Sequence, residues 1–225
     1  MKAKLRKAAP AKTPATQERL LNAAEALFAE REFDAVSIRD IAARADARLA
    51  LVHYYFGTKE KLFRKVLARR VEELSQRRLG LLAAYRQSGR RKISVVRIVE
   101  AFVLPVLEFS MSGDEGWKSY IRLNGRVATS DKYLRMAGNL YDPVAQIFIT
   151  ELAKTLGKAS RREIEWGFFF MVSVMSGAFS DSGRIERLSG GREKSSDVAD
   201  AYRVMVPFIT SGLSEIGRLP VTRRK

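Results

Sequence analysis

The sequence predicts an all-α fold with two parts, a small N-terminal unit of short helices and a larger helical body, joined by one long helix. Three observations support this prediction. Apolar residues recur every three or four positions along most of the chain, and no stretch shows the strict alternation typical of strands. Polar segments containing Gly or Ser interrupt the pattern at 88–92, 112–116, 129–132, 156–160 and 189–197. The length of 225 residues also exceeds that of one small domain.

The composition limits the possible functions. The chain has 41 Lys and Arg against 25 Asp and Glu, a formal charge of +16 that favours nucleic acid or another anionic partner. The absence of cysteine excludes disulfides, thiolate metal sites and a thiol nucleophile. The single histidine, His53, excludes multi-histidine metal sites. The acid pairs Glu72–Glu73 and Glu163/Glu165 cannot share a helix face, so we expect no enzyme, no cofactor and no metal.

The N-terminal residues 1–15 form a basic arm that is too polar to order itself alone. Two interpretations stand side by side: the arm follows the phosphates or minor groove of DNA, or it only keeps the chain soluble. No apolar signal segment follows it, so we expect a cytoplasmic protein. The longest apolar run, 166–179, is interrupted and shorter than the roughly 20 residues that span a bilayer. We therefore expect a buried helix there and no membrane partner.

The elements of the N-terminal unit follow from caps and periodicity. Thr16 is predicted to cap a first amphipathic helix, and Ser37 with Asp40 predicts a capping box at the start of a short second helix. After a turn at 45–48, a third helix runs to Phe56, and Thr58 is predicted to cap the long helix. We expect domain boundaries at 16–64 and 65–225, inside this long helix.

Residues 37–56 have the dimensions of a helix-turn-helix, in which the second helix enters the major groove of DNA. Its inward positions are predicted to be Ile38, Ile41, Ala45, Val52 and Phe56. Its outward positions are predicted to be Arg48, Leu49, Leu51, His53 and Tyr54. A lone histidine without a nearby acid in the sequence fits a surface or DNA-contacting role better than catalysis.

Three motifs resemble the N-terminal domain of the TetR/AcrR family of transcriptional regulators. They are T-x-E-x-L-L-x-A-A-x-x-L-F at 16–28, S-I-R-D-I-A-x-x-A at 37–45, and Y-Y-F-G-x-K-E-x-L-F at 54–63. The resemblance implies a TetR-like fold: a helix-turn-helix domain followed by a helical domain for effector binding and dimerisation. This chain departs from the usual pattern of the family at Asp46-Ala47-Arg48, where Gly-Val-Ser is common, and at Glu32, where the first helix commonly ends in Gly.

The resemblance also implies which residues meet double-stranded DNA. Together with Arg48 at the departing turn, the expected contacts are Thr16, Ser37, Leu49, Ala50, Leu51, His53, Tyr54 and Lys59. Helix N-termini attract phosphates, which suits Thr16, Ser37 and Lys59. Leucines offer only apolar contacts, so hydrogen bonding to bases would fall to Arg48, His53 and Tyr54. The sequence leaves open whether Arg48 or Leu49 begins the base readout.

In the body, the family implies an effector pocket and a dimer interface. The residues expected to line the pocket are Trp117, Tyr120, Arg122, Leu123, Arg126, Met136, Tyr141, Phe148, Trp166 and Phe170. The last two long helices, near 160–187 and 197–217, have broad apolar faces and small residues, which predicts a four-helix homodimer interface. The residues expected there are Phe168, Met175, Phe179, Val204 and Phe208.

The leading hypothesis is a homodimeric repressor that binds a pseudo-palindromic operator and is released by an unknown small-molecule effector. The alternative is an architectural protein that binds DNA through charge with little sequence preference. Steep salt dependence without an enriched motif would identify that alternative.

Overall fold

The structure, a computed structural model, describes residues 14–87 and 92–218. These residues form helices and contain no strand, which confirms the all-α prediction. The helices are α1 (Pro14–Glu30), η1 (Phe33–Ala35), α2 (Ile38–Arg44), α3 (Leu49–Phe56), α4 (Lys59–Gln87), α5 (Val95–Ser110), α6 (Glu115–Thr129), α7 (Asp131–Ala137), α8 (Asp142–Leu156), α9 (Arg161–Ala178), α10 (Arg184–Ser189) and α11 (Val198–Ile216). The basic arm lies outside the described residues apart from its last two positions, which already belong to α1.

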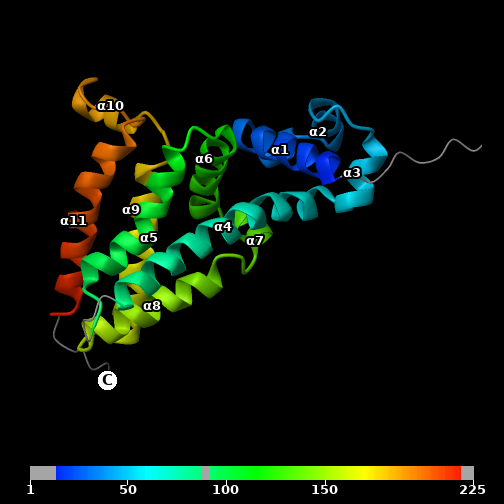
Figure 1. Ribbon diagram of the computed structural model, residues 1–225. Coiled ribbons are helices and arrows are strands. Elements are labelled where there is room, and N and C mark those ends of the chain that lie inside the picture. The colour runs from blue at the N-terminus through cyan, green and yellow to red at the C-terminus, as the bar shows by residue number, and fades with distance from the viewer. Residues whose placement is uncertain (1–13, 88–91, 219–225) are drawn as a thin grey trace, which may run out of the picture.

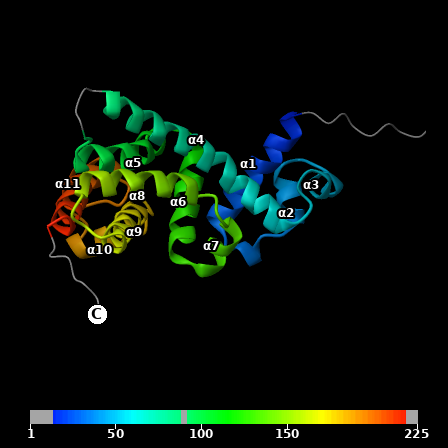
Figure 2. The same cartoon turned by 90° about the horizontal axis from the view of Figure 1, so that it is seen from below.

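The molecule is elongated, with α1, α2 and α3 at one end and α10 and α11 at the other (Figure 1). Helix α4 crosses from the first group to the second, and the view from below in Figure 2 shows the same course. The predicted joining helix is therefore present. None of the helices in the two described ranges has the length and apolar character needed to cross a bilayer.

Aromatic packing and caps hold the N-terminal unit together. Phe28, Phe33 and Phe63 form a cluster with ring centroids 5.2–5.6 Å apart, which joins α1, η1 and α4. The capping box of α2 is present: the Ser37 hydroxyl accepts from the Asp40 N–H at 3.1 Å, and the Asp40 carboxylate accepts from the Ser37 N–H at 2.9 Å. The predicted capping box is confirmed. Of the predicted inward positions, Ile41, Ala45, Val52 and Phe56 are buried, and Ile38 is partly buried against the core.

One cap was predicted wrongly. Helix α1 begins at Pro14, so Thr16 lies within its first turn instead of preceding it. Proline fits the first turn of a helix because its missing N–H has no partner there in any case. Thr16 is half-buried, and its side chain is not the N-cap that the spacing suggested.

In the body, α5 packs against α4, α8 and α11, and α11 packs against α9. Phe102 on α5 contacts Phe148 and Phe168, with centroids 5.0 and 5.2 Å apart. Gly167 permits the close approach of α9 and α11 within one chain, because a Cβ there would meet Leu213 at 2.8 Å. The small residue at 167 thus serves packing inside the chain.

Candidate nucleic-acid interface and interior cavity

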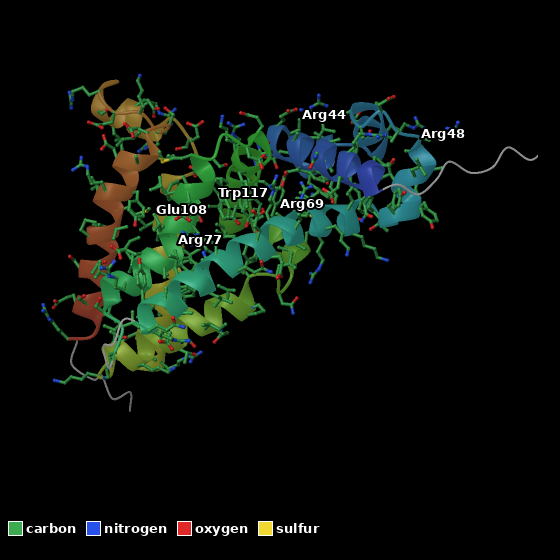
Figure 3. The ribbon with its side chains drawn as sticks, in the orientation of Figure 1. Arg44, Arg48, Arg69, Arg77, Glu108 and Trp117 are labelled. Carbon is green, nitrogen blue, oxygen red and sulfur yellow. The ribbon has the colours of Figure 1, made fainter. Side chains whose placement is uncertain are left out.

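Helix α3 turns one side towards solvent at the outer end of the molecule. Val52 and Phe56 are buried and fix the orientation of the helix. Figure 3 shows Arg48 at this end, far from the body. We call the exposed side the α3 face; it consists of Arg48, Leu49, Ala50, His53 and Tyr54. Five of the predicted contact residues therefore share one surface, on which Tyr54 is 58% exposed.

The start of α3 is set by the turn before it. Asp46 has a left-handed φ of 46°, as expected for a residue that replaces glycine in the turn. Arg19 holds the turn by donating from Nε to the Ala45 carbonyl at 3.2 Å. Arg48 is the N-cap with extended backbone, and its side chain makes no capping hydrogen bond. The helix thus begins at Leu49, and the exposed Arg48 guanidinium is not used to cap it.

His53 is tied to the end of its own helix. Its Nδ1 lies 3.1 Å from the Gly57 carbonyl oxygen, which accepts only, so Nδ1 carries the proton and donates. Gly57 itself has φ of 73°, a conformation that favours glycine. This hydrogen bond ties the ring to the residue that ends α3 and leaves the Nε2 edge on the exposed α3 face.

Two predicted DNA contacts are placed elsewhere. Leu51 is half-buried and packs against the core instead of lying on the exposed side of α3. Lys59 donates from Nζ to the Phe33 and Val36 carbonyls, both at 2.9 Å, and lies over the Phe33 ring at 4.2 Å. Its ammonium therefore ties α4 to the chain after α1. Its role as a free phosphate ligand does not fit this geometry.

An apolar cavity of about 270 Å³ lies among α4, α6, α8 and α9. Its walls are mostly apolar, with a few polar groups at one side. The lining includes Val71, Leu74, Arg78, Phe102, Tyr120, Asn124, Val127, Tyr141, Val144, Phe168, Phe169, Val172, Met175 and Ser176. A mostly apolar hollow with a few polar groups is the usual form of a small-molecule site.

Arg78 is the cation of this cavity and is only 6% exposed. Its Nε donates to the Phe102 carbonyl at 2.8 Å, and its guanidinium carbon lies 3.7 Å from the Phe102 ring centroid. Burial lowers the pKa of Arg78 to about 10 and raises that of Tyr120 to about 12. Burial and the neighbouring Tyr120 raise the pKa of Tyr141 well above its usual value. All three groups are thus buried close together in the cavity wall.

The structure brings only part of the predicted pocket together. Tyr120 and Tyr141 line the cavity, and Trp117 lines a small space beside it. Leu123, Phe148 and Met136 pack in or against the core without lining it. The other predicted residues face outward: Arg122 towards Asp181, Arg126 towards the carbonyls of Phe28 and Arg31, and Trp166 and Phe170 towards solvent.

The residues predicted for the dimer interface are wrong at and after α9, whereas those on α11 are compatible with the structure. Phe168, Met175 and Phe179 are buried inside the chain. Val204 and Phe208 are 60% and 67% exposed. Helix α9 is apolar on two sides, so its periodicity did not show which side faces inward. We call the exposed set the apolar face; it consists of Trp166, Phe169, Phe170, Ile185, Leu188, Val204 and Phe208.

Sequence reasoning missed Arg78, although a signal was present. Leu74, Arg78 and Leu82 are spaced four residues apart, and the two leucines are core residues of α4. A charged residue at a core position of a helix predicts a buried charge with a partner or a ligand. The Gln-Arg-Arg context hid this pattern among ordinary surface charges.

A buried ion pair joins the N-terminal unit to the body. Glu25 on α1 is 1% exposed and accepts from Arg70 Nε and Nη2 at 2.9 and 2.8 Å, and from Arg69 Nη2 at 2.9 Å. Arg70 also lies over the Trp117 ring at 4.9 Å. Gly116 makes room for it, since a Cβ there would meet Arg70 Nη2 at 1.9 Å. Figure 3 shows Arg69 and Trp117 at this junction.

Comparisons with known proteins agree with these features. Residues 20–66 match the family model described as bacterial regulatory proteins of the tetR family, and residues 100–212 match the tetracyclin repressor-like C-terminal domain. A 48-residue segment is 54% identical to the HTH-type transcriptional repressor Rv3405c of Mycobacterium tuberculosis. That match covers 21% of this chain and only 26% of the relative, so it concerns one domain.

Solved structures share the fold over nearly the whole chain. Salmonella enterica GusR is 15% identical with a TM-score of 0.56, covering 93% of this chain and 99% of that one. Bacillus subtilis FadR in complex with stearoyl-CoA is 13% identical with a TM-score of 0.58, covering 87% and 98%. A Saccharomonospora viridis regulator in complex with choline is 20% identical with a TM-score of 0.53, covering 88% and 96%. At these identities the likeness concerns the fold alone.

Proposed function

The chain belongs to the TetR family of DNA-binding transcriptional regulators, and from this premise we propose that it is a ligand-responsive repressor that binds a pseudo-palindromic operator as a homodimer. One observation carries the proposal: helix α4 is continuous from Lys59, which holds the start of the helix beside the reading unit, to Arg78 in the cavity. A change in the cavity therefore reaches the DNA-binding end without crossing a flexible linker.

The α3 face supplies the readout. Arg48 suits a guanine edge, which offers two acceptors in the major groove. His53 presents its Nε2 edge to a base, because its Nδ1 already donates to the Gly57 carbonyl. The first N–H groups of α2 and α4 are the phosphate sites, in place of the Lys59 ammonium.

The apolar face supports a homodimer. Val204 and Phe208 on α11 line one hollow together with Ile185 and Leu188 of α10, and Trp166, Phe169 and Phe170 of α9 are also exposed. Exposed apolar residues in such number on a chain of this charge are typical of a protein interface. Two copies joined by α9 and α11 would form the four-helix contact that the sequence predicts. Two reading helices related by a two-fold axis match an inverted repeat.

A chain of contacts connects the cavity to α1. Tyr120 of the cavity wall packs edge-on against Trp117 at 5.5 Å, Trp117 lies under Arg70, and Arg70 bonds Glu25 on α1. A ligand that displaces the Tyr120 side of α6 would shift these packed groups together. The two reading helices would then change their spacing, and operator affinity would fall. The FadR structure with stearoyl-CoA and the Saccharomonospora regulator with choline are fold relatives that hold small molecules, which supports a ligand response here.

The test is selection of bound sequences from a randomised duplex pool at physiological salt. The proposal expects an inverted repeat with half-site centres about one or more helical turns apart. Arg48→Ala should relax the preference at one base position in each half-site, by about 1–3 kcal/mol. Arg192→Ala, the same charge change on an exposed loop of the body, should leave the motif unchanged. Steep salt dependence without any enriched motif would support the architectural alternative instead.

A further inference from the structure

The polar corner of the cavity contains donors and a cation but lacks an anion. Among the described residues, Arg78 has no carboxylate partner, and its hydrogen bonds run only to the Phe102 carbonyl and, at 3.7 Å, to the Met175 sulfur. The hydroxyl groups of Tyr120, Tyr141 and Ser176 are buried. Those of Tyr120 and Tyr141 lie next to each other, and among the described residues none of the three makes a hydrogen bond of normal geometry. Each such group costs free energy when buried unsatisfied.

Other arginines on α4 have carboxylate partners, so the missing anionic partner is specific to Arg78. The adjacent Arg77 on α4 forms a two-bond pair with Glu108 at 2.6 and 2.7 Å. Arg86, two turns further on, pairs with the buried Glu151 at 2.5 Å. Arg78 alone of these three lines the cavity, and its guanidinium lies against the Phe102 ring with no carboxylate beside it among the described residues. A cation–π contact offsets part of the cost of burying a guanidinium, but it supplies no acceptor.

Resting on the proposed function, we propose that the effector is a small apolar carboxylic acid whose carboxylate binds Arg78 and the hydroxyl groups of Tyr120 and Tyr141. A carboxylate brings two acceptor oxygens and one negative charge, which together satisfy the guanidinium and both phenols. The rest of the ligand lies against Val127, Val144 and the other apolar walls. A cavity of about 270 Å³ accommodates a short acyl chain or a single ring.

The chemistry discriminates against other ligand classes. A quaternary ammonium would meet the Arg78 charge without an acidic residue among the lining groups. A neutral amide or alcohol supplies fewer acceptors and leaves the cation uncompensated. A phosphate group carries more negative charge than the single cation in the lining neutralises. The charge balance therefore favours one carboxylate.

The test is calorimetric titration of the full-length protein with matched acids and amides. The panel contains straight-chain acids from acetate to decanoate, benzoate and phenylacetate, and the primary amide of each. The acids with the best fit should bind about 10- to 100-fold more tightly than their amides, because charge-assisted hydrogen bonds are lost in the amide. Arg78→Gln should remove this preference. Arg77→Gln, the same change one residue away on the exposed side of α4, should retain it.

Thermal unfolding without ligand is the second measurement. Arg78→Met should leave the melting temperature equal or higher, since it removes a buried charge without an anionic partner. Each of three results would overturn the proposal. They are the absence of any acid-over-amide preference in the panel, a preference that survives in Arg78→Gln, and a marked loss of stability in Arg78→Met. DNA release is scored separately. If acids bind in an Arg78-dependent way without releasing DNA, the ligand response is refuted and the carboxylate site stands. If only neutral ligands release DNA, the ligand response stands and the carboxylate site is refuted.

Discussion

Breaking the buried pair between Glu25 and Arg70 should destabilise the whole molecule. In Glu25→Ala the Arg70 guanidinium, 8% exposed, loses both of its hydrogen bonds to the carboxylate. Removing one partner of a buried pair costs about 3–5 kcal/mol. The lower end applies here, because Asp114 lies 3.5 Å from Arg70 and compensates part of the charge. A loss of about 3 kcal/mol corresponds to a fall in melting temperature of about 6–12 °C for a chain of this size.

The assay is urea and thermal unfolding followed by circular dichroism. Glu30→Ala is the matched control on the same helix, since it breaks an exposed pair with Arg44 and should cost about 0–1 kcal/mol. The double variant Glu25→Leu with Arg70→Met should recover most of the loss, because no buried charge then remains. A cost for Glu25→Ala no larger than that of Glu30→Ala would refute the reasoning, as would a double variant that is as unstable as the single one.

Three further predictions concern other contacts. Lys59→Met should lower the unfolding free energy by about 1–3 kcal/mol, because two hydrogen bonds to backbone carbonyls are lost. The salt dependence of DNA binding should stay as in the wild type, and a shallower salt slope would show that Lys59 contacts a phosphate. Phe208→Glu should shift the mass measured by light scattering from two chains to one, and an unchanged dimer would place the interface elsewhere. The hydrogen bond from Arg77 lowers the pKa of Glu108 below 4.5, so the pair stabilises the fold above that pH. This contribution disappears as the pH falls through the lowered pKa. Arg77→Gln should therefore flatten the loss of unfolding free energy at acid pH, and an unchanged pH dependence would contradict the pairing.

Local features of the N-terminal unit were predictable because they depend on residues close in sequence. The capping box of Ser37 and Asp40 closes over three residues, and the left-handed turn at Asp46 needs only a tolerant side chain. The start of α1 was missed by three residues because Pro14 and Thr16 are both acceptable near a helix start. Competing local signals of similar strength leave such a boundary undecided.

Contacts between distant segments were not predictable from spacing. Lys59 carries the family motif, yet its ammonium lies beside carbonyls 23 and 26 residues earlier in the chain. Trp166 and Phe170 have the same apolar character as Phe168, but they lie on the opposite side of α9. A helix that is apolar on two sides gives no direction by itself, and its neighbours decide which side becomes core.

The helical class, the helix-turn-helix and the family could be inferred without the structure, because caps, turns and three- to four-residue periodicity act within a few residues of each other. Packing between distant helices, in contrast, places Arg78 in an apolar cavity, binds Lys59 internally and makes Glu25 join the two parts of the chain. The environment of a charged side chain depends on which distant helices enclose it. That enclosure is a property of packing and is not encoded in the spacing of any single helix.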